Sequence, residues 1–291
     1  MGWIVDPRLL GAASLQVASS LMPHLDANGL SVAYEVDGAG PPLVLLHGAT
    51  GGGGDHFATL APVVARGFRT YLPDARGHAG TRWDAADGWT AADLVDDLAA
   101  FADGLGLATF HLLGYSMGAM TALQFAAHHP DRLRTLVVIS ISPEREPRLS
   151  VGRRLLDPER IEAQDPAWAH QLSARHDPVQ GTGGWQRLLP AMVADLAAQP
   201  LLTPHELRAI DPPTLVVVGD RDPFAPVDQA WRLARQVRDG RLLVLPGVAH
   251  DAIDDLPAVL HPALGDFYQT TAAVAHARAT VGGRTTAMED T

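Results

Sequence analysis

The chain has 291 residues, of which 47% are hydrophobic, and a formal net charge of −11 at pH 7. This length suits one large α/β domain with an insertion, or two small domains. The negative charge argues against a nucleic-acid partner, because binding to phosphates needs a cationic surface. The chain has no cysteine, so disulfides, thiolate nucleophiles and cysteine-based metal sites are excluded.

All 22 basic residues are arginine. The absence of lysine excludes Schiff-base chemistry, a serine–lysine dyad and a P-loop. The four glycines at residues 51–54 also lack the P-loop spacing, and we interpret them as backbone that lines the mouth of a pocket. No residues have the spacing of a metal site or of a dinucleotide-binding fingerprint, so we expect no metal and no cofactor.

The N-terminal segment, residues 1–22, contains a short apolar stretch. Asp6 precedes it, where a secretory signal would carry basic residues, and the stretch is too short to span a bilayer. We interpret this segment as an N-terminal extension or a short docking helix. We expect a cytoplasmic protein without a membrane span, and the sequence is compatible with a homodimer.

Strands and helices alternate in the first half of the chain. Short apolar runs predict strands at residues 30–36, 43–46, 70–72, 110–114 and 136–141. Apolar residues at helical spacing predict helices at residues 55–64, 91–105 and 117–129. This alternation is typical of a parallel sheet covered by helices on both faces.

The pattern changes between residues 143 and 205, where helical segments occur without a convincing strand. It resumes with predicted strands at 214–218 and 242–245 and helices at 227–237 and 256–268. We therefore predict an α/β core of residues 23–142 and 206–270, with residues 143–205 inserted as a helical cap. Residues 271–291 are small and polar, which predicts a disordered tail.

Ser116 is the candidate nucleophile, in the motif Gly-Tyr-Ser-Met-Gly at residues 114–118. The motif alone is weak evidence in a chain with 28 glycines. Its context strengthens it, because a strand–turn–helix in this position lifts a serine side chain above the edge of a sheet. Such a turn needs small neighbours, and Gly114, Gly118 and Ala119 supply them. The competing interpretation is a serine that caps an ordinary helix.

A serine hydroxyl needs a general base, and His250 follows the last predicted strand of the sheet. The carboxyl ends of parallel strands meet at one edge, so His250 is expected near Ser116. The histidine in turn needs a carboxylate, and both Asp220 and Asp222 follow the strand at 214–218. We favour Asp222, which lies further into the loop, and expect Asp220 to bond local backbone or Arg221.

An oxyanion hole should come from two backbone amides. Met117 directly follows the nucleophile, and Ala49 lies in the loop after the strand at 43–46. We assign the oxyanion hole to these two amides.

Four further residues are candidates for substrate binding. Gly48 and Tyr115 adjoin the oxyanion hole and the nucleophile. Trp168 and Trp185 are either an apolar wall of the pocket or the core of the cap, and the sequence leaves both open.

Five arginines begin the predicted cap. They are either a solvated helix face or a surface that steers a carboxylate-bearing substrate. They are Arg145, Arg148, Arg153, Arg154 and Arg160.

Together these motifs resemble the α/β-hydrolase superfamily, in its capped branch of esterases, lactonases and C–C bond hydrolases. The matching pieces, spread over residues 25–270, are His47-Gly48, Asp74 to His78, the motif around Ser116, Asp222 and His250. The resemblance implies an α/β fold with an eight-stranded, mostly parallel sheet, flanking helices and an inserted helical cap. Ser116 stands where epoxide hydrolases and haloalkane dehalogenases carry aspartate, which argues against those two activities.

We therefore expect a serine hydrolase that cleaves a small-molecule carboxylic ester or lactone through a Ser-His-Asp triad and an acyl-enzyme. One alternative is C–C bond hydrolysis, cofactor-free haloperoxidation or acyl transfer on the same triad. Another is a ligand sensor that uses the hydrolase fold without catalysis.

Overall fold

The computed structural model describes residues 22–285, and side chains through residue 271. The interpretation of residues 1–22 therefore falls, apart from Met22, outside the described residues, as do residues 286–291.

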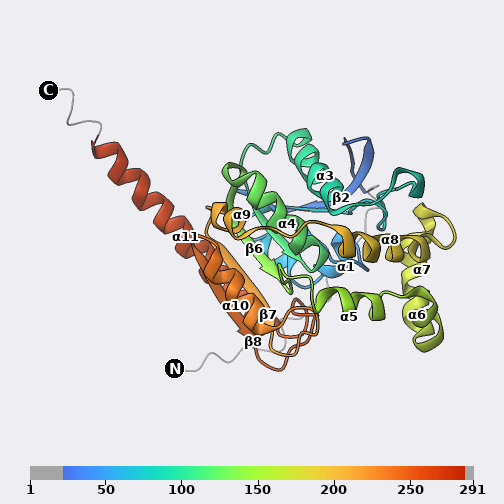
Figure 1. Ribbon diagram of the computed structural model, residues 1–291. Coiled ribbons are helices and arrows are strands. Elements are labelled where there is room, and N and C mark those ends of the chain that lie inside the picture. Colours follow the sequence, from blue (N-terminus) through green and yellow to red (C-terminus); the bar gives the residue numbers. More distant parts are fainter. Residues whose placement is uncertain (1–21, 286–291) are drawn as a thin grey trace, which may run out of the picture.

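A single sheet of eight strands forms the centre of the molecule (Figure 1). Strands β1 and β2 are antiparallel to each other, β2 is antiparallel to β4, and all other neighbours are parallel. The spatial order is β1 (His24–Ala27), β2 (Leu30–Asp37), β4 (Arg69–Pro73), β3 (Pro42–Leu46), β5 (Phe110–Tyr115), β6 (Leu133–Ile139), β7 (Thr214–Gly219) and β8 (Gly240–Leu245). The predicted mostly parallel, eight-stranded sheet is confirmed.

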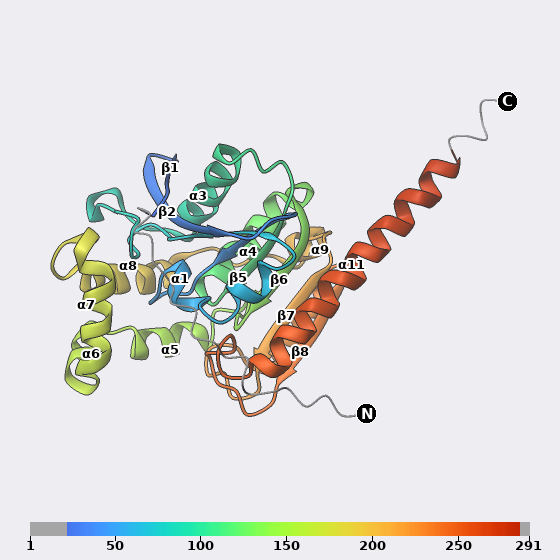
Figure 2. The same ribbon diagram turned by 180° about the vertical axis from the view of Figure 1, so that it is seen from behind.

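Helices cover both faces of this sheet (Figure 2). One face packs against α3 (Ala91–Gly104), α4 (Met117–His128) and α10 (Val227–Gln236), which contribute Leu98, Leu123 and Leu233 to one apolar cluster. The other face packs against the segment 53–64 and α11 (Pro257–Thr285), through Phe57 and Leu264 among others. Because both faces are covered, the central strands are almost wholly apolar.

The segment predicted as one helix at residues 55–64 forms two short ones, α1 (Gly53–His56) and α2 (Ala61–Val64). Pro62 lies in the first turn of α2. A proline in the interior of a longer helix would remove one hydrogen bond and clash with the carbonyl of residue 58, so the helix restarts here.

Two short 3₁₀ turns, Ala85–Asp87 and Pro130–Arg132, occur before β6. Five helices occupy the stretch between β6 and β7. They are α5 (Arg148–Leu155), α6 (Pro158–Gln164), α7 (Pro166–Gln180), α8 (Gly184–Ala198) and α9 (Pro204–Ala209). Helices α6, α7 and α8 share an apolar cluster that includes Leu172 and Trp185. The division into a core and a cap at residues 143–205 remains our interpretation.

The C-terminal helix α11 continues through Thr285, into the segment for which the sequence predicts a disordered tail (Figure 1). The segment is rich in alanine, which has the highest helix propensity. A prediction from its small and polar composition does not take this propensity into account. Within residues 22–285, no helix combines the length and the apolar character needed to cross a bilayer.

Candidate active site

Ser116 lies in a sharp turn between β5 and α4, with φ 52° and ψ −110°. A positive φ is strained for a residue with a side chain, and such strain is typical of functional turns. The turn is closely packed. A Cβ atom on Gly114 would lie 2.2 Å from the Gly118 carbonyl oxygen, and one on Gly118 would lie 2.1 Å from that of Leu46. The glycines on either side of the serine are therefore required by contact with the neighbouring backbone.

His250 reaches this serine from the loop after β8, with its Nε2 atom 2.9 Å from the Ser116 hydroxyl oxygen. A hydrogen bond fixes the backbone of this loop, because the Ser140 hydroxyl donates to the carbonyl of His250 at 2.9 Å. The imidazole is partly open to solvent, with 20% of its side chain exposed. It can therefore meet a substrate and exchange a proton with it.

Asp222 contacts the other ring nitrogen of His250. Both of its carboxylate oxygens lie 3.0 Å from Nδ1. One of them also accepts hydrogen bonds from the amides of Phe224 and Ala225, so the carboxylate is fixed in place. Asp220 is exposed and instead accepts a hydrogen bond from the Gly247 amide at 2.7 Å. Of the two aspartates weighed in the sequence, Asp222 is therefore the one that contacts the histidine.

Two pockets meet at Ser116 and His250. The first, which we call the inner pocket, has an empty volume of about 630 Å³, part of it open to solvent, and contains Met120, Ser140 and Arg148. The second, the outer pocket, has about 700 Å³ and contains Tyr115, Trp168 and the exposed Asp251. A substrate attacked at Ser116 thus has separate room for two portions.

Ala49 and Met117, the predicted oxyanion residues, both line the inner pocket beside Ser116. Among residues 22–285, the Ala49 amide has no hydrogen-bond partner. The helix α4 begins at Met117, and helix N-termini favour negative charge. This arrangement suits an anionic intermediate, although the role of each amide stays a prediction.

The loop after β3, which carries Ala49, is held by four histidines, of which three are buried and His56 is half-buried. His56 accepts a hydrogen bond from the Gly48 amide, His47 contacts the Gly48 carbonyl, and His78 contacts the Ala49 carbonyl. The fourth, His176 on α7, accepts from the Ala79 amide and contacts the Thr50 carbonyl.

Burial is the largest cause of a lowered pKa in all four histidines. The pKa falls to about 3 for His47, His78 and His176 and to about 4 for His56. The side chains also repel one another as cations, which adds to the effect. These rings are therefore neutral at physiological pH and act as hydrogen-bonding supports for the loop.

The four predicted substrate-binding residues differ in position. Tyr115 and Trp168 line the outer pocket, and the Tyr115 hydroxyl donates to Asp251 at 2.8 Å. Gly48 lies against the Tyr115 ring and lines neither pocket. Trp185 also lines neither of the two pockets. It is 1% exposed, packs in the apolar cluster of α6–α8 and donates to the Ser173 hydroxyl. The structure therefore places Trp185 in this apolar cluster and not on a pocket wall.

Phe224 is a pocket residue that the sequence does not single out, and Arg148 is one of five arginines whose role the sequence leaves open. The Phe224 ring lies 4.4 Å from the His250 ring, centre to centre, and lines both pockets. Its place two residues after Asp222 was an available signal. Arg148 lines the inner pocket, and no sequence pattern separates it from the four other arginines between residues 145 and 160.

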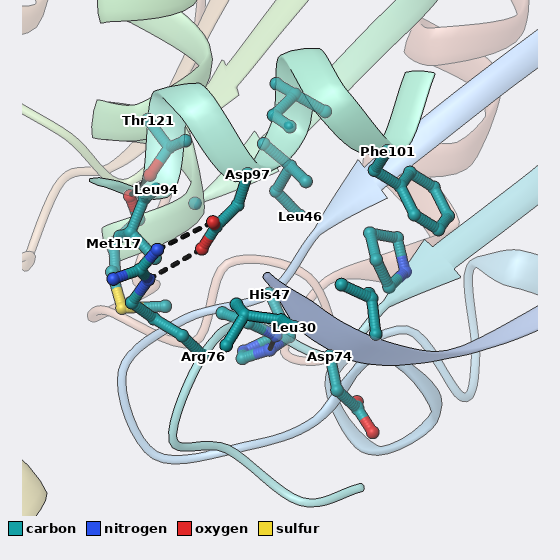
Figure 3. A pocket seen from close by; sticks show the side chains of 15 residues that line it. Leu30, Leu46, His47, Asp74, Arg76, Leu94, Asp97, Phe101, Met117 and Thr121 are labelled. Atoms are coloured by element: carbon teal, nitrogen blue, oxygen red, sulfur yellow. Dashed lines mark hydrogen bonds and ion pairs between the residues drawn. The ribbon is translucent and has the colours of Figure 1, made fainter. Parts of the chain in front are cut away.

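A further cavity lies on the other side of Met117, between β2 and α3 (Figure 3). Figure 3 shows Arg76 and Asp97 joined there by two hydrogen bonds of 2.7 Å. Both side chains are buried, and their ion pair connects the loop after β4, which carries Arg76, to α3, which carries Asp97. Neither Ser116 nor His250 lines this cavity, so we interpret it as a packing defect beside a structural ion pair.

In the part of the chain that the structure describes, no three His, Asp or Glu side chains are grouped so that they could hold a metal ion.

The family model described as "alpha/beta hydrolase fold" matches residues 41–201. The chain is 26% identical over 278 residues to a 2-(acetamidomethylene)succinate hydrolase of Mesorhizobium japonicum, covering 88% of this chain and 98% of the relative. It is 29% identical over 245 residues to a 2-hydroxy-6-oxononadienedioate/2-hydroxy-6-oxononatrienedioate hydrolase of Pseudomonas putida, covering 72% and 80%. The solved structure of an enol-lactonase from Burkholderia xenovorans has a similar fold, with a TM-score of 0.67 and 22% identity, covering 85% of this chain and all of that one.

Proposed function

Because the chain belongs to the α/β-hydrolase family and is a hydrolase, we propose that it cleaves a small carboxylic ester or lactone through an acyl-enzyme on Ser116. The observation that carries this proposal is the continuous hydrogen-bonded line from Asp222 through His250 to Ser116. It ends at a strained turn that faces two pockets.

In the first step, the Ser116 oxygen bonds to the ester carbonyl carbon while His250 accepts the hydroxyl proton on Nε2. The carbonyl oxygen becomes an oxyanion, stabilised by the amides of Ala49 and Met117. The carbon–oxygen bond to the alcohol then breaks, and His250 returns the proton to the leaving alcohol. Asp222 stabilises the imidazolium through both of its oxygens and keeps the ring in the required tautomer.

In the second step, water bonds to the acyl carbon while His250 takes one of its protons. The bond to Ser116 breaks and the serine regains its hydrogen from His250. The products are the free acid and the unchanged enzyme, so no cofactor or oxidant is needed.

A second candidate is hydrolysis of a C–C bond on the same residues. The relative from Pseudomonas putida supports it, since its name describes a hydrolase of an oxo-dienoic or oxo-trienoic diacid. The two reactions differ in the bond that is broken, so a direct comparison of substrates separates them.

The proposal predicts that the purified chain hydrolyses 4-nitrophenyl acetate and that Ser116→Ala lowers kcat by roughly 10⁴-fold or more, because the nucleophile is lost. Stopped-flow measurement of nitrophenolate release checks both, with an initial burst expected if deacylation is the slower step. Arg154→Gln, an exposed change on α5, is the matched control. Turnover of a vinylogous diketone without turnover of any ester would favour the second candidate. Equal esterase activity in Ser116→Ala would refute the nucleophile.

A further inference from the structure

Arg148 is the first residue of α5, and its side chain points into the molecule. It is 6% exposed and lines the inner pocket together with Ser116 and His250. The other arginines that begin the cap have different surroundings. Arg153, Arg154 and Arg160 are exposed, and Arg145 donates to the carbonyls at the end of α8. Arg148 is the arginine of this group that faces the candidate nucleophile.

The hydrogen bonds of Arg148 are incomplete. Its Nε atom donates to the Glu144 carbonyl at 3.3 Å, but the buried Nη2 atom has no partner among the described residues. A buried guanidinium without partners is costly, because transfer from water removes its hydration without replacement. A buried cation with one unpaired nitrogen on the wall of a pocket is therefore a position where an anion can bind favourably.

The charges around Arg148 leave it available. Burial is the main cause that lowers its pKa, to about 10, and Arg145 adds repulsion. The side chain remains a cation at neutral pH, since that value lies well above 7. Asp195 lines the same pocket and partly balances the charge, but it forms no ion pair with Arg148 in residues 22–285. Burial raises the pKa of Asp195.

The inner pocket is the more suitable place for the acyl group. Its walls include the buried Met120, Ile141 and Met192, whereas the outer pocket reaches the exposed Asp251. The acyl group stays on Ser116 until water attacks, while the alcohol must leave after the first step. Apolar walls suit the hydrocarbon part of an acyl group, and a pocket that reaches an exposed carboxylate suits the alcohol that leaves.

We propose that Arg148 binds a carboxylate at the far end of the acyl group, so that the substrates are esters of short dicarboxylic acids. This inference rests on the proposed function and specifies its substrate class. The Nη2 atom donates to the carboxylate while the ester carbonyl lies at Ser116. The apolar walls between them contact the methylene chain.

The test compares 4-nitrophenyl hydrogen glutarate with 4-nitrophenyl valerate, which have acyl chains of the same length and differ in the terminal carboxylate. For the natural chain we expect kcat/KM to favour the glutarate ester by roughly 10- to 100-fold, the range of a charge-assisted hydrogen bond. In Arg148→Gln the ratio of the two kcat/KM values should fall to near one, mainly through a higher KM for the glutarate ester.

Three further variants distinguish a loss of carboxylate binding from a loss of folded protein, because each predicts a specific change in the ratio of the two kcat/KM values. Arg148→Lys should retain part of the preference, because it keeps the charge. Asp195→Asn should increase it, because a repelling carboxylate is removed. Arg154→Gln on the same helix should leave the ratio unchanged.

The two levels of the proposal fail in distinguishable ways. Hydrolysis of the valerate ester without preference for the glutarate ester would overturn the inference and leave the proposed function intact. The same holds if the preference survives in Arg148→Gln, or if that variant loses activity on both esters in equal proportion and has a lower Tm. Absence of turnover of both esters, with no reaction at Ser116, would overturn the proposed function itself.

Discussion

The two aspartates after β7 differ in whether their side chains contact His250. Asp220 and Asp222 are two residues apart in one loop, yet only Asp222 contacts His250, with both oxygens at 3.0 Å. The buried carboxylate is held by two amides, whereas Asp220 is exposed and bonds Gly247. The chain order of serine, aspartate and histidine could be predicted from the sequence. The choice between the two aspartates depends on how the loop folds, which local sequence patterns do not determine.

This difference predicts opposite results for two matched variants. Asp222→Asn should lower kcat by about 10³- to 10⁴-fold, because the amide can donate to Nδ1 and hold the ring in the wrong tautomer. Asp220→Asn should stay within a few-fold of the natural chain. Steady-state kinetics with a nitrophenyl ester measures both. If Asp220→Asn were the inactive variant, the relay described above would be misassigned.

At the scale of elements, the loop after β3 is held in place by several histidine side chains. Histidines from four different segments bond its backbone or lie beside it, and α7 contributes His176 and Arg175. Arg175 donates to the Thr50 carbonyl at 2.8 Å. The helices between β6 and β7 thus touch the loop that carries Ala49. The sequence showed thirteen histidines but gave no sign that four of them converge, because the contacts join residues far apart in the chain.

These histidines make stability depend on pH. Burial lowers the pKa of His47, His78 and His176 to about 3 in the folded chain, whereas in the unfolded chain each imidazole has its ordinary pKa of about 6.5. Between these values the unfolded state binds more protons. The free energy of unfolding should therefore fall as the pH is lowered from about 6.5 toward 4.

Urea unfolding followed by circular dichroism at pH 7.5, 6.0 and 5.0 measures this dependence. His176→Gln is the informative comparison, because the amide can still accept from the Ala79 amide but does not titrate. It should give a shallower fall in the urea midpoint than the natural chain. An unchanged midpoint between pH 7.5 and 5.0 would contradict the account of four neutral rings.

For the molecule as a whole, the sequence predicted what short-range patterns determine. The buried strands, the parallel order of the sheet and the placement of Ser116 and His250 at its carboxyl edge all follow from apolar runs and from positions after strands. Other features depend on three-dimensional packing. Trp185 and Trp168 are equivalent in the sequence, but one is enclosed by α6–α8 and the other lines a pocket. Likewise, the burial of Arg148 could not be inferred from its neighbours.

The central claim is that Ser116 is the nucleophile of this hydrolase. The chain offers a clean measurement, because trypsin cleaves it after arginine only, and the peptide from Trp83 to Arg132 contains Ser116 as its single serine. After incubation with a fluorophosphonate probe, mass spectrometry of the digest should show one adduct, on that peptide and at Ser116. The adduct should form far more slowly in His250→Gln, because the general base is lost. An unlabelled chain, or an adduct at another residue with Ser116 unmodified, would contradict the account.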